Sequence, residues 1–107
     1  MVVISRPVTL LALVLSGVVV LPLRASSLSG LESNAKRCLQ GGERSACDTA
    51  LLQAETLARR ASSRGSYPCQ TLLLGLQADL IMQQLGDGRG EKAIAAVTTT
   101  VRGCAGL

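Results

Sequence analysis

Four cysteines, spread over a chain of only 107 residues, constrain the fold more than any other feature. They are Cys38, Cys47, Cys69 and Cys104, separated by 9, 22 and 35 residues. A zinc site made of four cysteines uses close pairs two to four residues apart, and this spacing contains no such pair. An even number of dispersed cysteines in a short exported chain is instead typical of disulfide bonds. We therefore expect two disulfides and an oxidising compartment.

The N-terminal segment predicts that the chain is exported. Residues 1–6 carry a positive charge at Arg6, and residues 8–21 form an apolar stretch that Pro22 interrupts. This order is typical of a secretory signal peptide. The apolar stretch is shorter than the ~20 residues that a membrane-spanning helix needs, which disfavours the alternative of an uncleaved signal anchor. The protein is therefore expected in the periplasm or outside the cell.

Small residues after the apolar stretch provide a cleavage site. Ala25 and Ser27 stand at the −3 and −1 positions for cleavage after Ser27, whereas cleavage after Ala25 would place the larger Leu23 at −3. We expect a signal peptide over residues 1–27. Residues 28–107 then form one small domain held together by disulfides.

Apolar residues recur with helical periodicity in four segments of this domain, and strand patterns are absent. The segments begin near Ser29, Ser45, Pro68 and Glu91 and end near Gly41, Ala61, Leu85 and Arg102. Ser29 and Glu32 form a capping-box pattern at the first start. The third segment is apolar on more than one face, with Gln70, Gln77 and Gln84 as its thin polar stripe, which predicts a central helix. We expect an all-α bundle of about four helices in two helical hairpins.

The order of the helices predicts which cysteines pair. Four cysteines allow three pairings. Short connections make consecutive helices antiparallel, so the end of the first helix lies beside the start of the second, and the start of the third beside the end of the fourth. We therefore predict the disulfides Cys38–Cys47 and Cys69–Cys104. The chain-entropy model assigns them about 2.7 and about 3.8 kcal/mol, for loops of about 10 and about 36 residues.

The residue types that are missing exclude whole classes of function. The chain has no histidine, tryptophan or phenylalanine, and only one tyrosine. A Ser-His-Asp or Cys-His catalytic site and an imidazole metal site are therefore excluded, and few rings are present for stacking on bases or sugars. Without Arg6 and Arg24 the net charge falls from +4 to +2, which is less positive charge than a nucleic-acid-binding domain carries. We expect no enzymatic activity, no cofactor, no metal and no nucleic-acid partner.

Several charged residues are candidates for a site, and each also has a structural interpretation. The glycine-rich run 86–90 lacks the preceding strand and the Lys-Ser/Thr pair of a phosphate-binding loop, so a helix cap followed by a turn is favoured. Asp79 lies among leucines and is either partly buried or, as is more common, a surface carboxylate. Asp48 and Glu55 are seven residues apart and share one solvated helix face.

The densest basic cluster consists of Arg59, Arg60 and Arg64, near the end of the second helix. Interaction with the helix dipole is the favoured interpretation, and weak contact with anionic lipid or an acidic partner is the alternative. An exported helical domain without catalytic groups is most simply a protein-interaction module with an unknown protein partner. The alternatives are a carrier of a small apolar molecule between the second and third helices and a protein that associates with a membrane surface through these arginines. Membrane contact is expected only through the signal segment or these arginines.

Part of the chain is similar to a known repeat class. Residues 31–54 resemble one tetratricopeptide-type helical hairpin, through the spacing of Leu31, Ala35, Cys38, Gly42, Cys47, Leu51 and Ala54. The resemblance implies two packed antiparallel helices with cysteines at two packing positions, as in secreted relatives that carry disulfides. The aromatic positions of the repeat are missing, and the second half does not continue it, although a solenoid normally needs three repeats. The whole chain also resembles small exported cyanobacterial proteins, which implies no function.

Overall fold

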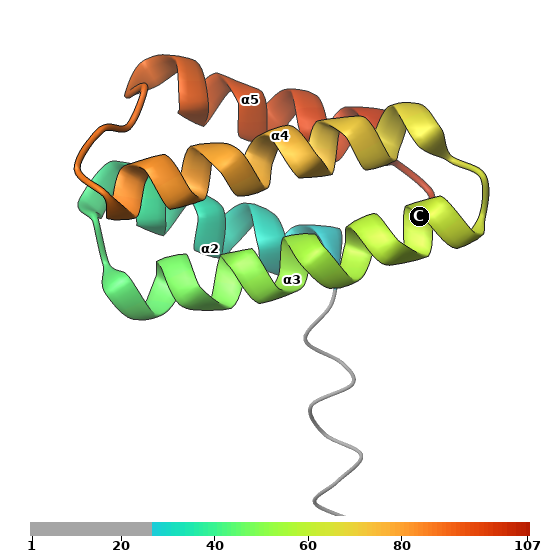
Figure 1. The fold of residues 1–107 in the computed structure, drawn as a ribbon, viewed down its shortest axis with the longest axis horizontal. Helices are drawn as coiled ribbons and strands as arrows, with labels where there is room; N and C mark the ends of the chain where they lie inside the picture. The colour runs from blue at the N-terminus through green and yellow to red at the C-terminus, as the bar shows by residue number, and fades with distance from the viewer. Residues whose placement is uncertain (1–26) are drawn as a thin grey trace, which may run out of the picture.

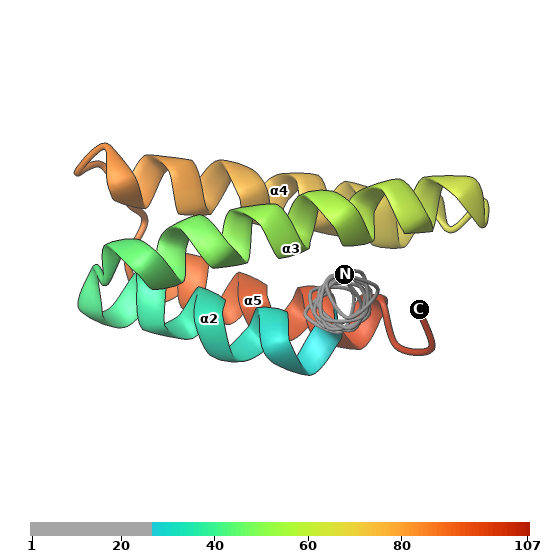
Figure 2. The same ribbon diagram turned by 90° about the horizontal axis from the view of Figure 1, so that it is seen from below.

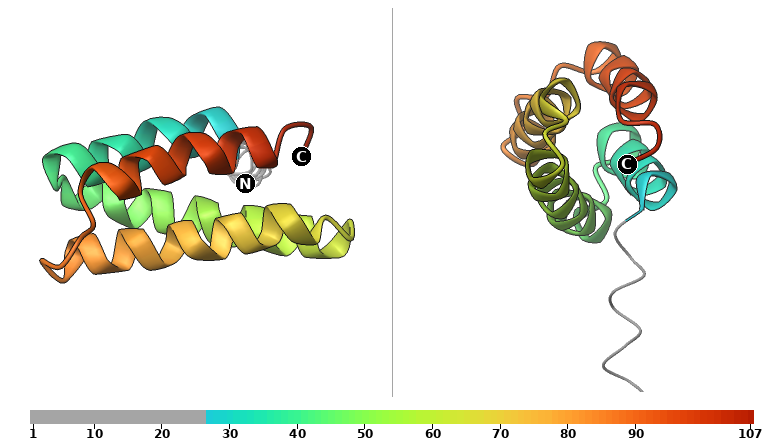
Figure 3. Two further views of the ribbon diagram at one scale, coloured as in Figure 1. Left: turned by 90° about the horizontal axis from the view of Figure 1, so that it is seen from above. Right: turned by 90° about the vertical axis from the view of Figure 1, so that its right-hand side faces the viewer.

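The computed structural model describes residues 27–107, and four α-helices contain most of them. These are α2 (Leu28–Gly41), α3 (Arg44–Ser63), α4 (Tyr67–Gln84) and α5 (Glu91–Gly103). Consecutive helices run antiparallel and close into a ring, in which α2 and α4 each lie beside both α3 and α5 (Figure 1 and Figure 3). No strand occurs in the described part, so the predicted all-α bundle of two hairpins is confirmed. The predicted signal peptide lies outside the described residues, apart from Ser27.

The helices begin and end within two residues of the predicted positions, but the cap of α2 differs from the prediction. Ser27 is extended, with φ −120° and ψ 157°, and its side chain accepts a hydrogen bond from the backbone N–H of Gly30 at 3.1 Å. This is the geometry of an N-cap. Ser29 lies inside the helix, so the predicted capping box of Ser29 and Glu32 is wrong. Glu32 pairs with Lys36 one turn later, at 3.1 Å.

A left-handed glycine and an ion pair form the turn between α2 and α3. Gly42 has φ +65°, and its N–H donates to the carbonyl of Cys38 at 2.9 Å. Only glycine adopts this backbone conformation at little cost. Arg37 donates hydrogen bonds of 2.6 and 3.3 Å to the Glu43 carboxylate. The hydrogen bond and the attraction between the charges lower the pKa of Glu43 and raise the pKa of Arg37.

Two buried disulfides hold opposite ends of the bundle. Cys38 bonds to Cys47 between α2 and α3, and Cys69 bonds to Cys104 between α4 and α5. Both predicted pairs are confirmed, and all four cysteines are at most 2% exposed. Leucine and alanine fill the space between them, with the largest fully buried side chains at Leu31, Leu57, Leu73, Leu76, Leu80 and Val97. Each disulfide lies within one hairpin, so no disulfide joins the two hairpins, which pack against each other along α3–α4 and α2–α5.

The third predicted helix, α4, is not the central helix that its sequence indicates. In a ring of four helices, each helix has an inner and an outer face, and the outer face of α4 reaches solvent beside α3 (Figure 2). Leu73 and Leu80 are fully buried, while Leu74 and Ile81 are 51% and 46% exposed. A helix that is apolar on all sides is normally covered on all sides. Four helices are too few to provide that cover, which leaves apolar side chains in water.

Candidate interaction surface

A row of uncharged side chains runs along the outer face of α4. Its members are Tyr67, Leu74, Ala78, Ile81 and Leu85, and we call them the α4 ridge. They recur at intervals of three, four or seven residues, which places them on one side of a helix. All five are exposed, and Leu85, just past the end of the helix, is 74% exposed.

The neighbouring strip of α3 adds one apolar side chain and a charged edge to the ridge. Leu52 is 67% exposed. Arg59 pairs with Glu55 at 3.1 Å, and both line a shallow groove of about 400 Å³ between α3 and α4, together with Leu74. Nearer the end of α4, the Gln84 amide donates a 2.8 Å hydrogen bond to Asp48. An apolar centre with a polar, charged edge is the usual anatomy of a protein–protein interface.

On the other side of α4, a buried carboxylate fixes the connection to α5. The side chain of Asp79 is 8% exposed, so the buried interpretation of this residue holds. Arg89 donates from Nε and Nη2 to the two oxygens of Asp79, at 2.7 Å each, which is a bidentate pair. These hydrogen bonds, and the attraction between the charges, raise the pKa of Arg89. The glycine-rich run 86–90 therefore connects two helices and is held against α4 through its arginine.

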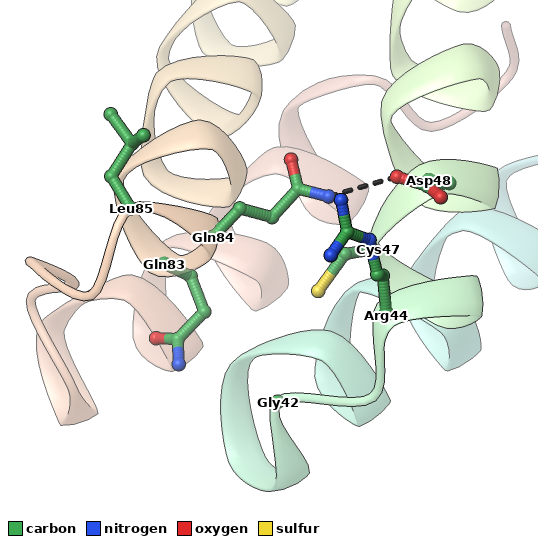
Figure 4. A pocket seen from close by; sticks show the side chains of 7 residues that line it. All are labelled: Gly42, Arg44, Cys47, Asp48, Gln83, Gln84 and Leu85. Carbon is green, nitrogen blue, oxygen red and sulfur yellow. Dashed lines mark hydrogen bonds between the residues drawn. The ribbon is translucent and has the colours of Figure 1, made fainter.

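A polar pocket of about 470 Å³ lies at one end of the bundle, between the α2–α3 turn and the end of α4 (Figure 4). It is lined by Gly42, Arg44, Cys47, Asp48, Gln83, Gln84 and Leu85. Figure 4 shows Gln84 reaching across to Asp48, beside Arg44. Both charged residues are exposed, and Cys47 is in a disulfide. The pocket is therefore an open surface depression, and its one carboxylate, Asp48, already accepts a hydrogen bond from Gln84.

A second groove of about 400 Å³ lies between α4 and α5, where Thr71, Gly75 and Ala95 keep the side chains short. Throughout residues 27–107, every buried side-chain nitrogen or oxygen atom has a hydrogen-bond partner. The same residues contain no group of three acidic or cysteine side chains placed to hold a metal ion, and no helix long and apolar enough to cross a membrane. Neither groove therefore presents a buried, unsatisfied polar group to a ligand.

The other residues singled out from the sequence have separate environments. Arg59 pairs with Glu55, Arg60 is half-buried, and Arg64 donates to the backbone oxygen of Leu107. Asp48 and Glu55 are both exposed on α3, as predicted. The facing residues of α3 and α4, including Leu57, Leu73 and Leu76, belong to the core.

The α4 ridge is the functional candidate that the sequence analysis missed. Its signal was present, because apolar residues occur on more than one face of α4, but it was interpreted as a sign of central packing. No protein-family model matches the chain, and no curated protein or solved structure is significantly similar to it. The geometry of the ridge is therefore the basis of the functional interpretation.

Proposed function

We propose that this protein is an exported, non-enzymatic interaction module that binds a partner protein through the α4 ridge. The observation that carries the proposal is a clustering of exposed apolar residues. Within residues 27–107, the large hydrophobic side chains that are exposed are Leu52, Tyr67, Leu74, Ile81 and Leu85. All of them lie on the outer face of α3 and α4. A contiguous apolar patch with a polar edge is typical of an interaction site, whereas isolated exposed leucines are not.

The shape of the patch favours a protein partner over a small molecule. The ridge extends from Tyr67 to Leu85, about 27 Å at 1.5 Å per residue. The groove beside it, which Leu74 lines, is shallow, whereas small-molecule sites enclose their ligands. A row of exposed side chains on a helix fits between the side chains of another helix or into a groove. The pairing of Arg59 with Glu55 at its edge reduces the free positive charge that would favour an anionic lipid surface.

The two disulfides support the proposed export, because such bonds persist in oxidising compartments. The intact mass of the protein from its native host tests this part of the proposal. We expect the mass of a chain shortened at its N-terminus by a signal peptide, less four hydrogens for two disulfides. Cleavage after Ala25 retains the Ser27 cap of α2, whereas cleavage after Ser27 removes it at a cost of about 1 kcal/mol. A full-length, reduced mass would contradict export.

Leu74→Glu tests the binding surface directly. This side chain is already half-exposed, so the charge is tolerated by the folded monomer but disrupts an apolar contact. Gln40→Glu is the matched control, because it adds the same charge at an exposed position of α2, diagonally across the ring from α4. We expect a partner cross-linked in the native extracytoplasmic fraction by the wild type and Gln40→Glu, but not by Leu74→Glu. Equal recovery with all three proteins, each shown to be folded, would refute the ridge as the binding surface.

A further inference from the structure

We infer that the α4 ridge docks onto the same ridge of a second copy of this chain, forming a two-fold symmetric dimer with the α4 helices antiparallel. The inference rests on the proposed function and names its partner. A two-fold interface requires one surface that is complementary to itself. The ridge meets this requirement in its apolar centre and in its charged edge.

Four of the five ridge side chains pair with one another about a single midpoint, at the level of Leu76, and Ile81 comes opposite Thr71, which is also exposed. Tyr67 and Leu85 lie nine residues to either side of Leu76, and Leu74 and Ala78 lie two residues to either side. A two-fold axis across α4 at this level therefore places Tyr67 on Leu85 of the second copy. It also places Leu74 on Ala78, a large side chain opposite a small one. Large side chains opposite small ones let facing helices interdigitate.

The same axis also brings opposite charges together on α3. The hydrogen bond between Gln84 and Asp48 shows which residues of the antiparallel helices are level, so residue 56 of α3 is level with residue 76 of α4. Arg59 lies three residues past that point, and the two-fold axis carries it to the level of residue 53 in the other copy. This is about 3 Å along the helix from Glu55 and about 8 Å from Asp48. Arg59, which pairs with Glu55 of its own copy, thus also comes close to Glu55 of the opposite copy, which favours this pairing.

The area of the face indicates a weak, reversible dimer. The ridge is about 27 Å long, and a face two helices wide spans about 20 Å. Pairing of two such faces buries about 1,000 Å² in total, at the lower limit for a specific protein interface. We therefore expect a dimer that dissociates in the micromolar range.

Sedimentation velocity over a dilution series of the oxidised protein tests the inference. We expect the wild type to change from dimer to monomer on dilution. Ala78→Trp should raise the dissociation constant at least about tenfold, because the indole occupies the space that receives Leu74 of the other copy. Ala78 is exposed in the single copy, so the folded monomer tolerates the change. Gln40→Trp, exposed on α2, is the matched control and should dimerise like the wild type.

The outcomes separate this inference from the proposed function. Weaker dimerisation of Ala78→Trp with an unchanged Gln40→Trp control supports the two-fold pairing. A wild type that stays monomeric well above the micromolar range overturns it, as does a dimer that Ala78→Trp leaves unchanged. If the wild type is monomeric but Leu74→Glu still loses a cross-linked partner, the ridge binds a different protein and the proposed function stands. If the wild type is monomeric and Leu74→Glu retains its cross-linked partner, both proposals fail.

Discussion

At the residue scale, Gly41 and Gly42 are neighbours with opposite backbone requirements. Gly42 has φ +65°, whereas Gly41 is the last residue of α2, and a Cβ atom at either position meets nothing within 4 Å. We expect Gly42→Ala to lower the free energy of unfolding by about 1 kcal/mol, because alanine is strained at positive φ. Gly41→Ala should raise it by about 0.5–1 kcal/mol through helix propensity. Urea unfolding of both variants measures these changes. Effects of the same sign would contradict the different backbone conformations of Gly41 and Gly42.

Leu57 and Leu52 are also close in sequence but differ in burial. Leu57 is 1% exposed in the core, and Leu52 is 67% exposed on the outer face. Leu57→Ala should lower the free energy of unfolding by about 2–5 kcal/mol, since it removes packed atoms and leaves a cavity. Leu52→Ala should change it by no more than about 0.5 kcal/mol in the monomer. Thermal or urea unfolding at a concentration where the protein is monomeric provides the comparison, and similar losses would contradict it.

Because Arg89 pairs with the buried Asp79, removing its charge should destabilise the protein more than removing the charge of an exposed arginine. Arg89→Gln should lower the melting temperature, because it leaves the buried Asp79 carboxylate without its bidentate partner. Arg102→Gln is the control, since it removes the same charge at an exposed position of α5. Adding Asp79→Asn to Arg89→Gln should recover part of the loss by removing the buried charge. An equal loss in Arg89→Gln and Arg102→Gln would show that the pair contributes nothing specific.

At the scale of the element, the turn between α2 and α3 should respond to acid. Arg37 holds the pKa of Glu43 below its ordinary value of 4.5 in the folded protein, so folding is favoured while the carboxylate is ionised. This contribution is complete above pH 4.5 and is lost as the pH falls through the folded pKa. Melting temperatures of the wild type and Glu43→Gln should therefore differ at neutral pH and converge in acid. A difference in melting temperature that grows on acidification would contradict the predicted direction of the pH dependence.

The helices and the cysteine pairing were predictable because their determinants are local. Gly42 marks the end of α2, and Pro68 stands in the first turn of α4. Once four antiparallel helices are placed, Cys69 and Cys104 necessarily meet at one end of the bundle. The cap at Ser27 was missed because two serines two residues apart compete for the same role, and the sequence pattern with Glu32 favoured the other one.

The outer face of α4 and the position of Asp79 depend on information that local patterns do not contain. Apolar periodicity predicts that Leu74 and Ile81 will be covered. It does not show whether another helix of the same chain or a separate molecule covers them. The burial of Asp79 depends on the path of the six residues after α4, which bring Arg89 onto it. Glycine-rich connections have many accessible conformations, so this contact had no sequence signature.

At the scale of the whole molecule, the two disulfides should contribute unequally to stability. Cys69 and Cys104 are 35 residues apart in sequence, whereas Cys38 and Cys47 are 9 apart. Closing the longer loop removes more entropy from the unfolded chain, so replacing Cys69 and Cys104 by alanine should cost about 3.8 kcal/mol. Replacing Cys38 and Cys47 should cost about 2.7 kcal/mol. Urea unfolding of the two double variants gives the order, and a larger loss for the shorter loop would contradict the entropic explanation.

Because each disulfide lies within one hairpin, a single break in the chain between the hairpins divides the protein into two separate fragments. The covalent link between the hairpins is the short segment around Gly65, which a protease or a designed break can open without touching either disulfide. Two oxidised fragments would then remain, and the α3–α4 and α2–α5 contacts would have to bring them back together without covalent help. We therefore expect the two oxidised fragments to reassociate by complementation, and either half of one bundle to pair with the complementary half of another molecule.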